Sequence, residues 1–296
     1  MKPRTLAILQ AFLVTLLWSS SWVITKFALR DVPPLSFAGM RFVLAFLCLV
    51  PFTLNKSSYK QIKSIKKSGW IEILGLGILY YAVTPGGQNI GLNYLPANTL
   101  SLILSFTAVF VAFAGLYVLK EKPTLTQWFG LILFLIGVLV YFKESRETSL
   151  SLIGVITGIL TMLANSFSAV LGRKINKAGA LSPILVTTVS MGIGSLILLT
   201  VGISLEGLPK LNPINWIMIF WLAMINTAFA YQLWNKTLKT LPAIESTLIN
   251  NSMLVQISIL AWIFLGEKLT PIQITGLIIS MLGILAVQIF SPKNDH

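Results

Sequence analysis

Long apolar segments recur along the whole chain and are separated by short polar stretches. Ten of them can be counted, at residues 5–28, 34–53, 69–92, 97–119, 124–142, 152–173, 182–204, 213–236, 243–265 and 271–290. Each holds about twenty residues, the length that an α-helix needs to cross a hydrocarbon core roughly 30 Å thick. The runs are continuous rather than alternating, which argues against a β-barrel. The pattern therefore predicts an all-α integral membrane protein with ten transmembrane helices.

Composition supports a membrane setting. Apolar residues make up 55% of the chain and charged residues only 10%, whereas soluble domains carry about 25% charged residues. The first apolar run follows Lys2 and Arg4 but is too long for the core of a signal peptide and lacks a clear cleavage site. We therefore interpret it as the first transmembrane helix.

The charges are distributed unequally between the two sides of the predicted bundle. With a cytoplasmic N-terminus, the inner segments hold fifteen basic residues: Lys2, Arg4, Lys56, Lys60, Lys63, Lys66, Lys67, Lys120, Lys122, Arg173, Lys174, Lys177, Lys236, Lys239 and Lys293. The outer segments hold six: Lys26, Arg30, Lys143, Arg146, Lys210 and Lys268. This positive-inside bias predicts a multi-pass protein of the inner (plasma) membrane with both termini in the cytoplasm. The net charge of +13 therefore indicates orientation and contact with membrane lipid, not a nucleic-acid partner.

The second half of the chain repeats the first at an offset of 146 residues. The offset pairs Asn89 with Asn235 and Pro96 with Pro242, and residues 70–142 share 23 identities with residues 216–288 in 73 ungapped positions. We expect two five-helix repeats, at 1–145 and 146–296. Because five is odd, the second repeat should enter the membrane from the opposite side, an inverted architecture typical of secondary transporters. The alternative is a duplicated bundle with no transport role.

Particular motifs add a family resemblance. They are Leu17-Trp18-Ser19-Ser20-Ser21-Trp22, Arg41, and a Glu-Lys-x-Thr-x-x-Gln-x-x-Gly pattern at 121–130 and again at 267–276. With them the chain resembles the EamA-type carriers of the drug/metabolite transporter superfamily. The resemblance implies export or exchange of amino acids and related metabolites across a bacterial inner membrane. The chain departs from the family at Ala108 and Leu254, where the family often has proline, and at Ser20, where it often has glycine.

Polar and aromatic residues inside apolar helices are the candidates for a substrate site, because such groups face a bundle interior or a wet cavity. In the first helix Trp18 and Trp22 lie one turn apart on one face, and Ser21 adds a hydroxyl. The alternative for this stretch is close helix packing. The full set of candidates is Trp18, Ser21, Trp22, Arg41, Tyr80, Tyr81, Gln88, Asn98, Asn165, Tyr231, Trp234 and Glu245.

Backbone chemistry singles out the third helix. Pro85 removes a backbone donor and two glycines follow it, so a kink or an unwound segment is expected beside Tyr80, Tyr81 and Gln88. Broken helices of this kind form the binding sites of many transporters, although a simple structural kink is the alternative.

Two charged candidates each have two interpretations. Arg41 is suited to a bidentate contact with a substrate carboxylate, or else to a structural contact with backbone carbonyls. Glu245 is suited to carrying a proton or binding a cationic amine, or else to stabilising the N-terminal end of its own helix.

The sequence contains few residues of the kinds that enzymes use for catalysis. Cys48 and His296 are the only residues of their kinds, and no Walker-type segment is present. We therefore expect a secondary transporter with a small-molecule substrate, no cofactor, no metal and no enzymatic activity. A non-transporting scaffold or sensor, and less readily a membrane-embedded enzyme, are the alternatives. Glycines at seven-residue spacing in the fifth and tenth helices predict close packing, with a homodimer contact as the alternative.

Overall fold

The computed structural model describes residues 3–121, 123–143 and 151–290, and within them it contains helices and no strand. Seven helical stretches are long and apolar enough to cross a membrane: Arg4–Ala28, Pro34–Thr53, Ala97–Val118, Leu152–Ala178, Pro213–Thr237, Pro183–Glu206 and Ala243–Leu265. Shorter apolar helices cover Leu125–Tyr141 and Pro271–Val287. The chain is therefore a multi-pass membrane protein. Lys2, Lys122, Arg146, Lys293 and His296 lie outside the described residues.

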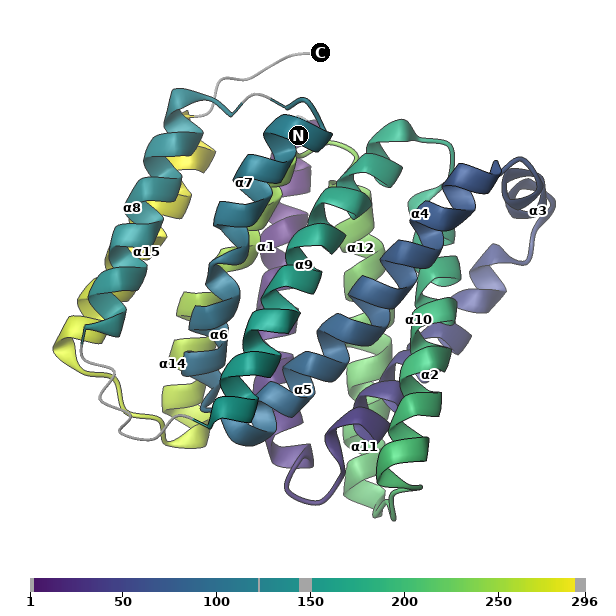
Figure 1. The fold of residues 1–296 in the computed structure, drawn as a ribbon, viewed down its shortest axis with the longest axis horizontal. Helices are drawn as coiled ribbons and strands as arrows, with labels where there is room; N and C mark the ends of the chain where they lie inside the picture. Colours follow the sequence, from purple (N-terminus) through teal and green to yellow (C-terminus); the bar gives the residue numbers. More distant parts are fainter. Residues whose placement is uncertain (1–2, 122, 144–150, 291–296) are drawn as a thin grey trace.

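The first repeat contains nine helical elements. They are α1 (Pro3–Ala28), α2 (Pro34–Thr53), α3 (Lys56–Lys63), α4 (Lys67–Ile78), η1 (Leu79–Val83), α5 (Thr84–Tyr94), α6 (Ala97–Ser105), α7 (Thr107–Val118) and α8 (Leu125–Phe142). The second comprises α9 (Leu152–Ala178), α10 (Pro183–Glu206), α11 (Pro213–Trp221), η2 (Leu222–Phe229), α12 (Ala230–Thr237), α13 (Ala243–Asn251), α14 (Met253–Leu265) and α15 (Pro271–Phe290). Figure 1 shows α1 beginning and α15 ending at the same end of the bundle.

Two features differ from the sequence-based expectation. The basic loop after α2 contains the short helix α3, because the Asn55 side chain caps it by accepting a hydrogen bond from Ser58 N at 2.9 Å. The sixth predicted helix continues past residue 173 as α9, since buried Arg173 and Asn176 find hydrogen-bond partners there. It ends where Gly179 takes a left-handed conformation with φ of 68°.

The expected disruption before Pro85 is a wide helical turn and not an unwound segment. The chain stays helical from Lys67 to Tyr94, with π-helical turns over η1, and Thr84 Oγ1 donates to Leu79 O at 2.8 Å. A π turn accommodates the proline because the donor that Pro85 lacks is not needed there. Helix η2 is the corresponding π segment of the second repeat, and it forms without a proline.

Single-residue breaks interrupt the fourth and ninth predicted helices at Phe106 and Ser252, which are 146 residues apart. The family's usual prolines are absent, yet both helices break. Asn251 Nδ2 donates to Ser105 O at 2.7 Å, which satisfies a carbonyl next to the first break. The two breaks therefore face each other in the interior.

Glycines bring α8 and α15 together along one edge of the bundle (Figure 1). A Cβ on Gly137 would lie 2.5 Å from Gly276 O, and one on Gly283 would lie 2.6 Å from Gly130 O. Only glycine permits this approach. The predicted close packing is present, and these glycine faces are covered within the chain itself.

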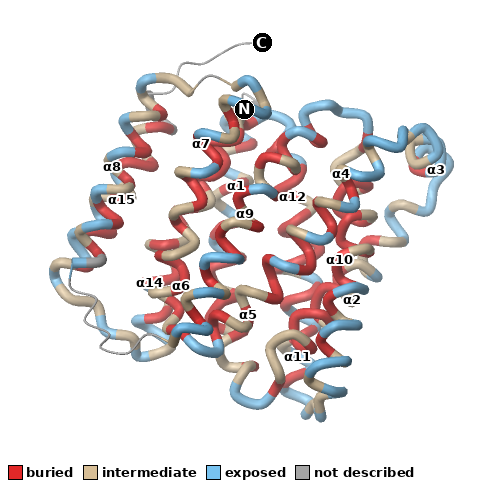
Figure 2. Tube along the Cα trace, viewed as in Figure 1, coloured by how far each residue is buried: buried red, intermediate tan, exposed pale blue. Residues whose placement is uncertain are grey.

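Burial follows the arrangement of a membrane bundle. Figure 2 shows buried stretches running through the central helices and exposed stretches at the bundle ends and on α3. Large apolar side chains remain exposed on outer faces, among them Leu16, Phe113, Ile132, Leu139 and Ile217. Such faces suit contact with lipid.

Candidate functional site

A central cavity lies between the two repeats. Its lining comprises Trp18, Ser21, Trp22, Arg41, Phe42, Tyr80, Thr84, Pro85, Gln88, Asn89, Ser101, Leu104, Ser105, Asn165, Tyr231, Asn250, Asn251, Met253, Leu254 and Ile257. Helices α1, α2, α5 and α6 and segment η1 contribute from the first repeat, and α9, α12, α13 and α14 from the second. The cavity encloses about 80 Å³, below the roughly 300–1,000 Å³ of typical ligand pockets. It must widen to admit a metabolite of ordinary size.

Tyr231 is the centre of an aromatic cluster on one side of this cavity. Its ring centroid lies 4.9 Å from that of Trp18, 5.1 Å from that of Tyr80 and 5.6 Å from that of Phe42. The rings are tilted or edge-to-face, the arrangements that aromatic pairs prefer. The cluster provides a rigid apolar wall against which a substrate can stack.

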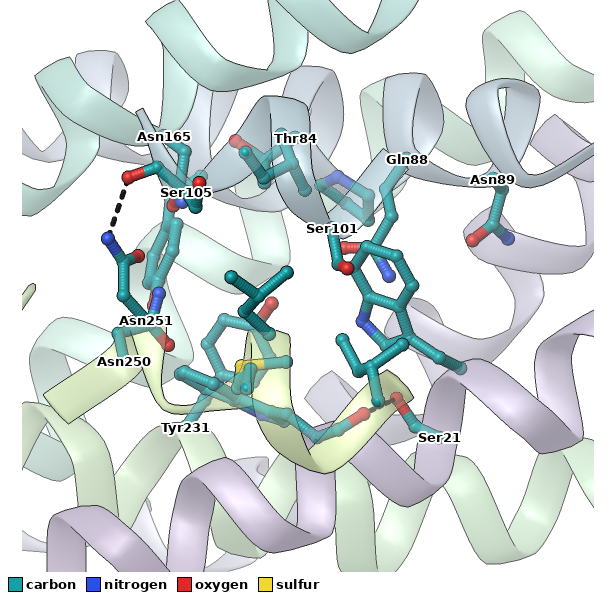
Figure 3. A pocket seen from close by; sticks show the side chains of 18 of the residues that line it. Ser21, Thr84, Gln88, Asn89, Ser101, Ser105, Asn165, Tyr231, Asn250 and Asn251 are labelled. Carbon is teal, nitrogen blue, oxygen red and sulfur yellow. Dashed lines mark hydrogen bonds between the residues drawn. The ribbon is translucent and has the colours of Figure 1, made fainter. Parts of the chain in front are cut away.

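Polar side chains occupy the other surfaces. Figure 3 shows Asn250 and Asn251 on one side of the cavity, with Gln88 and Ser101 on the opposite side. Asn251 is held by Ser105 O, and Asn89 Nδ2 donates to Pro34 O at 3.2 Å. Within the described residues, Trp18 Nε1 and Asn250 Oδ1 are buried and have no hydrogen-bond partner. Two residues of the lining therefore each carry a polar atom whose hydrogen-bonding capacity is unused in this conformation.

Arg41 brings a positive charge into this apolar setting. It lies in the third turn of α2, and its Nε donates to Thr227 Oγ1 at 2.8 Å. Its Cζ lies 5.5 Å from the centre of the Phe42 ring, close enough for a cation–π contact. None of the ion pairs among the described residues includes it.

Eight of the twelve residues predicted from sequence line the cavity: Trp18, Ser21, Trp22, Arg41, Tyr80, Gln88, Asn165 and Tyr231. The structure places the other four elsewhere. Tyr81 points away and accepts a hydrogen bond from Asn235 at 3.2 Å, while Asn98 accepts one from its neighbour Thr99 N at 2.7 Å near the end of the bundle.

Trp234 and Glu245 also lie outside the cavity lining. Trp234 packs behind Trp18 with ring centroids 5.2 Å apart, and it borders a smaller cavity with Tyr80 and Asn165. Glu245 lies at the end of the bundle where α1 begins and pairs with Arg4 at 2.7 Å. Glu245 lies in the first turn of its helix, as the second interpretation of this residue assumes, and the ion pair with Arg4 adds a contact that neither interpretation included.

Several lining residues were absent from the predicted set, notably Phe42, Thr84, Ser101, Asn250 and Asn251. The amides carried a signal, because two consecutive asparagines in an apolar helix need a polar environment. Phe42 carried none, since an aromatic residue in a membrane helix is ordinary. Among the described residues, no group of three or more His, Cys, Asp and Glu side chains is placed to hold a metal ion.

Comparison with known proteins places this architecture among transporters. The model of the EamA-like transporter family matches residues 5–143 and again residues 152–289. The uncharacterized transporter YvbV of Bacillus subtilis is 32% identical over 73% of this chain and 67% of its own length. An S-adenosylmethionine/S-adenosylhomocysteine transporter of Chlamydia trachomatis is 27% identical, covering 90% of this chain and 84% of its own. A probable amino-acid metabolite efflux pump of Salmonella typhimurium is 27% identical, with coverage of 93% and 92%.

Proposed function

The chain belongs to the EamA-like transporter family, and on that premise we propose that it is a secondary carrier of amino acids or related small polar metabolites. It works in the inner (plasma) membrane as an exporter or exchanger. The central cavity carries this proposal, because both repeats line it and it holds polar groups in an otherwise apolar interior. Binding between repeats near the middle of the membrane is the usual design of secondary transporters.

The ten-helix inverted arrangement is part of the proposal. Its support is a set of exchanged contacts. Gly130 approaches Gly283 while Gly137 approaches Gly276, so each glycine meets the counterpart of the other, as in a two-fold interface. In the same way Asn251 meets Ser105, its own counterpart. We propose an in-plane two-fold axis that relates two repeats meeting near residue 145. The excess of basic residues in the predicted inner segments supports two cytoplasmic termini.

Contacts at the two ends of the bundle support alternating access. Arg4 pairs with Glu245 at 2.7 Å and Arg173 with Glu121 at 2.9 Å, both at the end where α1 begins. At the other end, Lys26 Nζ donates to Leu95 O at 2.8 Å, and the described residues there form no ion pair. We infer that the ion-paired, cytoplasmic end is the more firmly closed of the two in this conformation.

The names of the relatives bear on the cargo. S-adenosylmethionine, S-adenosylhomocysteine and amino-acid metabolites are all amino acids or their derivatives. The cavity offers matching chemistry: aromatic rings for an apolar group, amides for hydrogen bonds and a cation for a carboxylate. We propose no enzymatic activity. A ligand-binding scaffold or sensor is the rival function, and it predicts saturable binding without flux.

Counterflow in proteoliposomes tests the proposal. Vesicles preloaded with an excess of one amino acid or derivative should accumulate the labelled form of the same compound from outside. Ser105→Trp fills the cavity and should abolish flux, whereas Phe110→Trp on the exposed face of α7 should leave it intact. Saturable binding of a compound that shows no counterflow would favour the scaffold instead.

A further inference from the structure

Arg41 and Arg173 are equally buried, each with 6% of its surface exposed, but they differ in their partners. Arg173 Nε contacts Glu121 Oε1 at 2.9 Å, and its Nη1 donates to Leu238 O at 2.6 Å. A buried charge is costly unless a counter-charge and hydrogen bonds compensate it. Arg173 has both, which is the pattern of a structural arginine.

Arg41 has neither. Within the described residues its only hydrogen bond joins Nε to Thr227 Oγ1, and no carboxylate lies within ion-pair distance. Its two terminal nitrogens, Nη1 and Nη2, make no hydrogen bond to the described part of the chain. The guanidinium is thus held in place by one edge, while its outer edge remains available.

The cavity that Arg41 lines contains no compensating charge either. None of its lining residues is aspartate or glutamate, so the lining side chains carry one formal positive charge. A positively charged cavity in an apolar surrounding attracts anions and repels cations. The planar outer edge of a guanidinium matches a carboxylate, whose two oxygens accept two parallel hydrogen bonds.

We propose that Arg41 binds the carboxylate of the transported metabolite through Nη1 and Nη2. The inference rests on the proposed carrier function and narrows its cargo to carboxylate-bearing molecules. Asn250 Oδ1, which lacks a partner within the described chain, accepts a hydrogen bond from a donor on the same molecule, such as an amino group. Trp18 Nε1, likewise without a partner there, donates to an acceptor.

Ligand-induced stabilisation of the purified protein tests the proposal without knowledge of the natural cargo. The probes are two acid–amide pairs of nearly equal shape, benzoate with benzamide and acetate with acetamide. Because hydrogen bonds to charged groups are the stronger ones, benzoate should bind the wild type about ten- to a hundredfold more tightly than benzamide. Arg41→Gln should remove this preference for the acid, and Arg41→Lys should retain part of it because only the charge survives.

Two control variants separate anion binding from other effects. Arg30→Gln removes an exposed arginine that stacks on Phe27 as Arg41 does on Phe42, and it should leave the preference unchanged. Thr227→Val removes the partner of Nε but keeps the charge of Arg41. It should therefore retain part of the preference for the acid, as Arg41→Lys does, and complete loss of the preference in both charge-retaining variants would contradict the proposal.

The proposal is also overturned if the wild type binds acid and amide equally, a comparison that needs no variant to fold. Counterflow distinguishes this failure from failure of the carrier function. Flux of neutral compounds, unaffected by Arg41→Gln, would leave the carrier standing and remove the carboxylate site. Acid-selective binding without any flux would support the carboxylate site and contradict the carrier function.

Discussion

Glu121 and Glu267 stand 146 residues apart, and each caps a helix of the other repeat. Glu121 Oε2 accepts a hydrogen bond from Ala243 N at 2.9 Å, and Glu267 Oε1 accepts one from Ala97 N at 3.0 Å. Helices α6 and α13 begin after proline and have no cap from their own side chains. A carboxylate from the opposite repeat satisfies their free N–H groups and complements the helix dipole. The Glu-Lys motif thus joins the two repeats at both ends of the bundle.

The two caps are not equivalent, and their neutral variants should differ. Glu121 also pairs with Arg173 and contacts Lys177 at 3.5 Å, so Glu121→Gln leaves a buried arginine without its counter-charge. We expect a loss of about 1–3 kcal/mol in the free energy of unfolding. Glu267→Gln weakens only a helix cap and should cost about 1 kcal/mol or less. Apparent melting temperatures in detergent should show this order, and equal losses would contradict it.

Tight packing between α8 and α15 gives a second prediction. A methyl group at Gly137 would lie 2.4 Å from Ser280 N and 2.5 Å from Gly276 O, both in backbone that cannot move aside cheaply. Gly137→Ala should therefore destabilise the protein by about 1–3 kcal/mol. Gly115→Ala is the matched control, because its new methyl group meets no atom of the described residues within 4 Å. That variant should be neutral or stabilising by up to about 1 kcal/mol, and thermal unfolding of both variants decides.

Much of the fold could be predicted because one physical requirement dominates a membrane chain. Every span must be apolar and about twenty residues long, so the apolar runs coincide closely with helices such as α2 and α10. The internal repeat could also be predicted, because the offset of 146 residues is visible in the sequence. Some positions paired by this offset are in contact in the structure, such as Ser105 and Asn251. The sequence alone does not show which of the paired positions touch.

The site was harder to predict, because the direction in which each side chain points depends on local helix geometry. Tyr80 and Tyr81 are neighbours, yet only Tyr80 lines the cavity. They lie in η1, where a wide turn changes the direction of each side chain relative to a regular helix. Trp18 and Trp234 look alike in sequence, but the first borders the cavity and the second supports it from behind. Helix packing, and not residue type, decides which of two aromatic side chains lines the cavity.

The repeat-related pair Asn89 and Asn235 gives a third prediction. Asn235 Nδ2 reaches Tyr81 Oη at 3.2 Å and Thr187 Oγ1 at 3.0 Å, and its Oδ1 accepts from Asn176 at 2.8 Å. Asn235→Ala leaves these buried groups without partners, so we expect a stability loss of about 1–3 kcal/mol.

Asn89 lines the cavity, and its side chain makes one hydrogen bond to the described part of the chain, to Pro34 O. Asn89→Ala should therefore cost less stability than Asn235→Ala and should change counterflow more. Measurements of melting temperature and counterflow on both variants test whether Asn235 serves mainly stability and Asn89 mainly transport. A larger stability loss at position 89 would show that its polar group is structural.

The last prediction concerns Glu245 and its partner. The carboxylate is almost fully buried and lies 2.7 Å from Arg4 Nη2, whereas the Arg4 side chain is 27% exposed. Replacing Glu245 leaves an unpaired arginine that can be hydrated, whereas replacing Arg4 leaves an unpaired carboxylate that is buried. Arg4→Gln should therefore destabilise the protein more than Glu245→Gln. The double variant should lose less than the two single losses added together, because the two residues interact directly.

Transport separates this structural role from proton carriage. Glu245 does not line the cavity, so Glu245→Gln should retain counterflow and any accumulation driven by a pH gradient. Loss of the pH-driven component with counterflow intact would identify Glu245 as a proton carrier and contradict the prediction. Loss of both, together with a lowered melting temperature, would instead mean that the end of the bundle where α1 begins needs this ion pair to close.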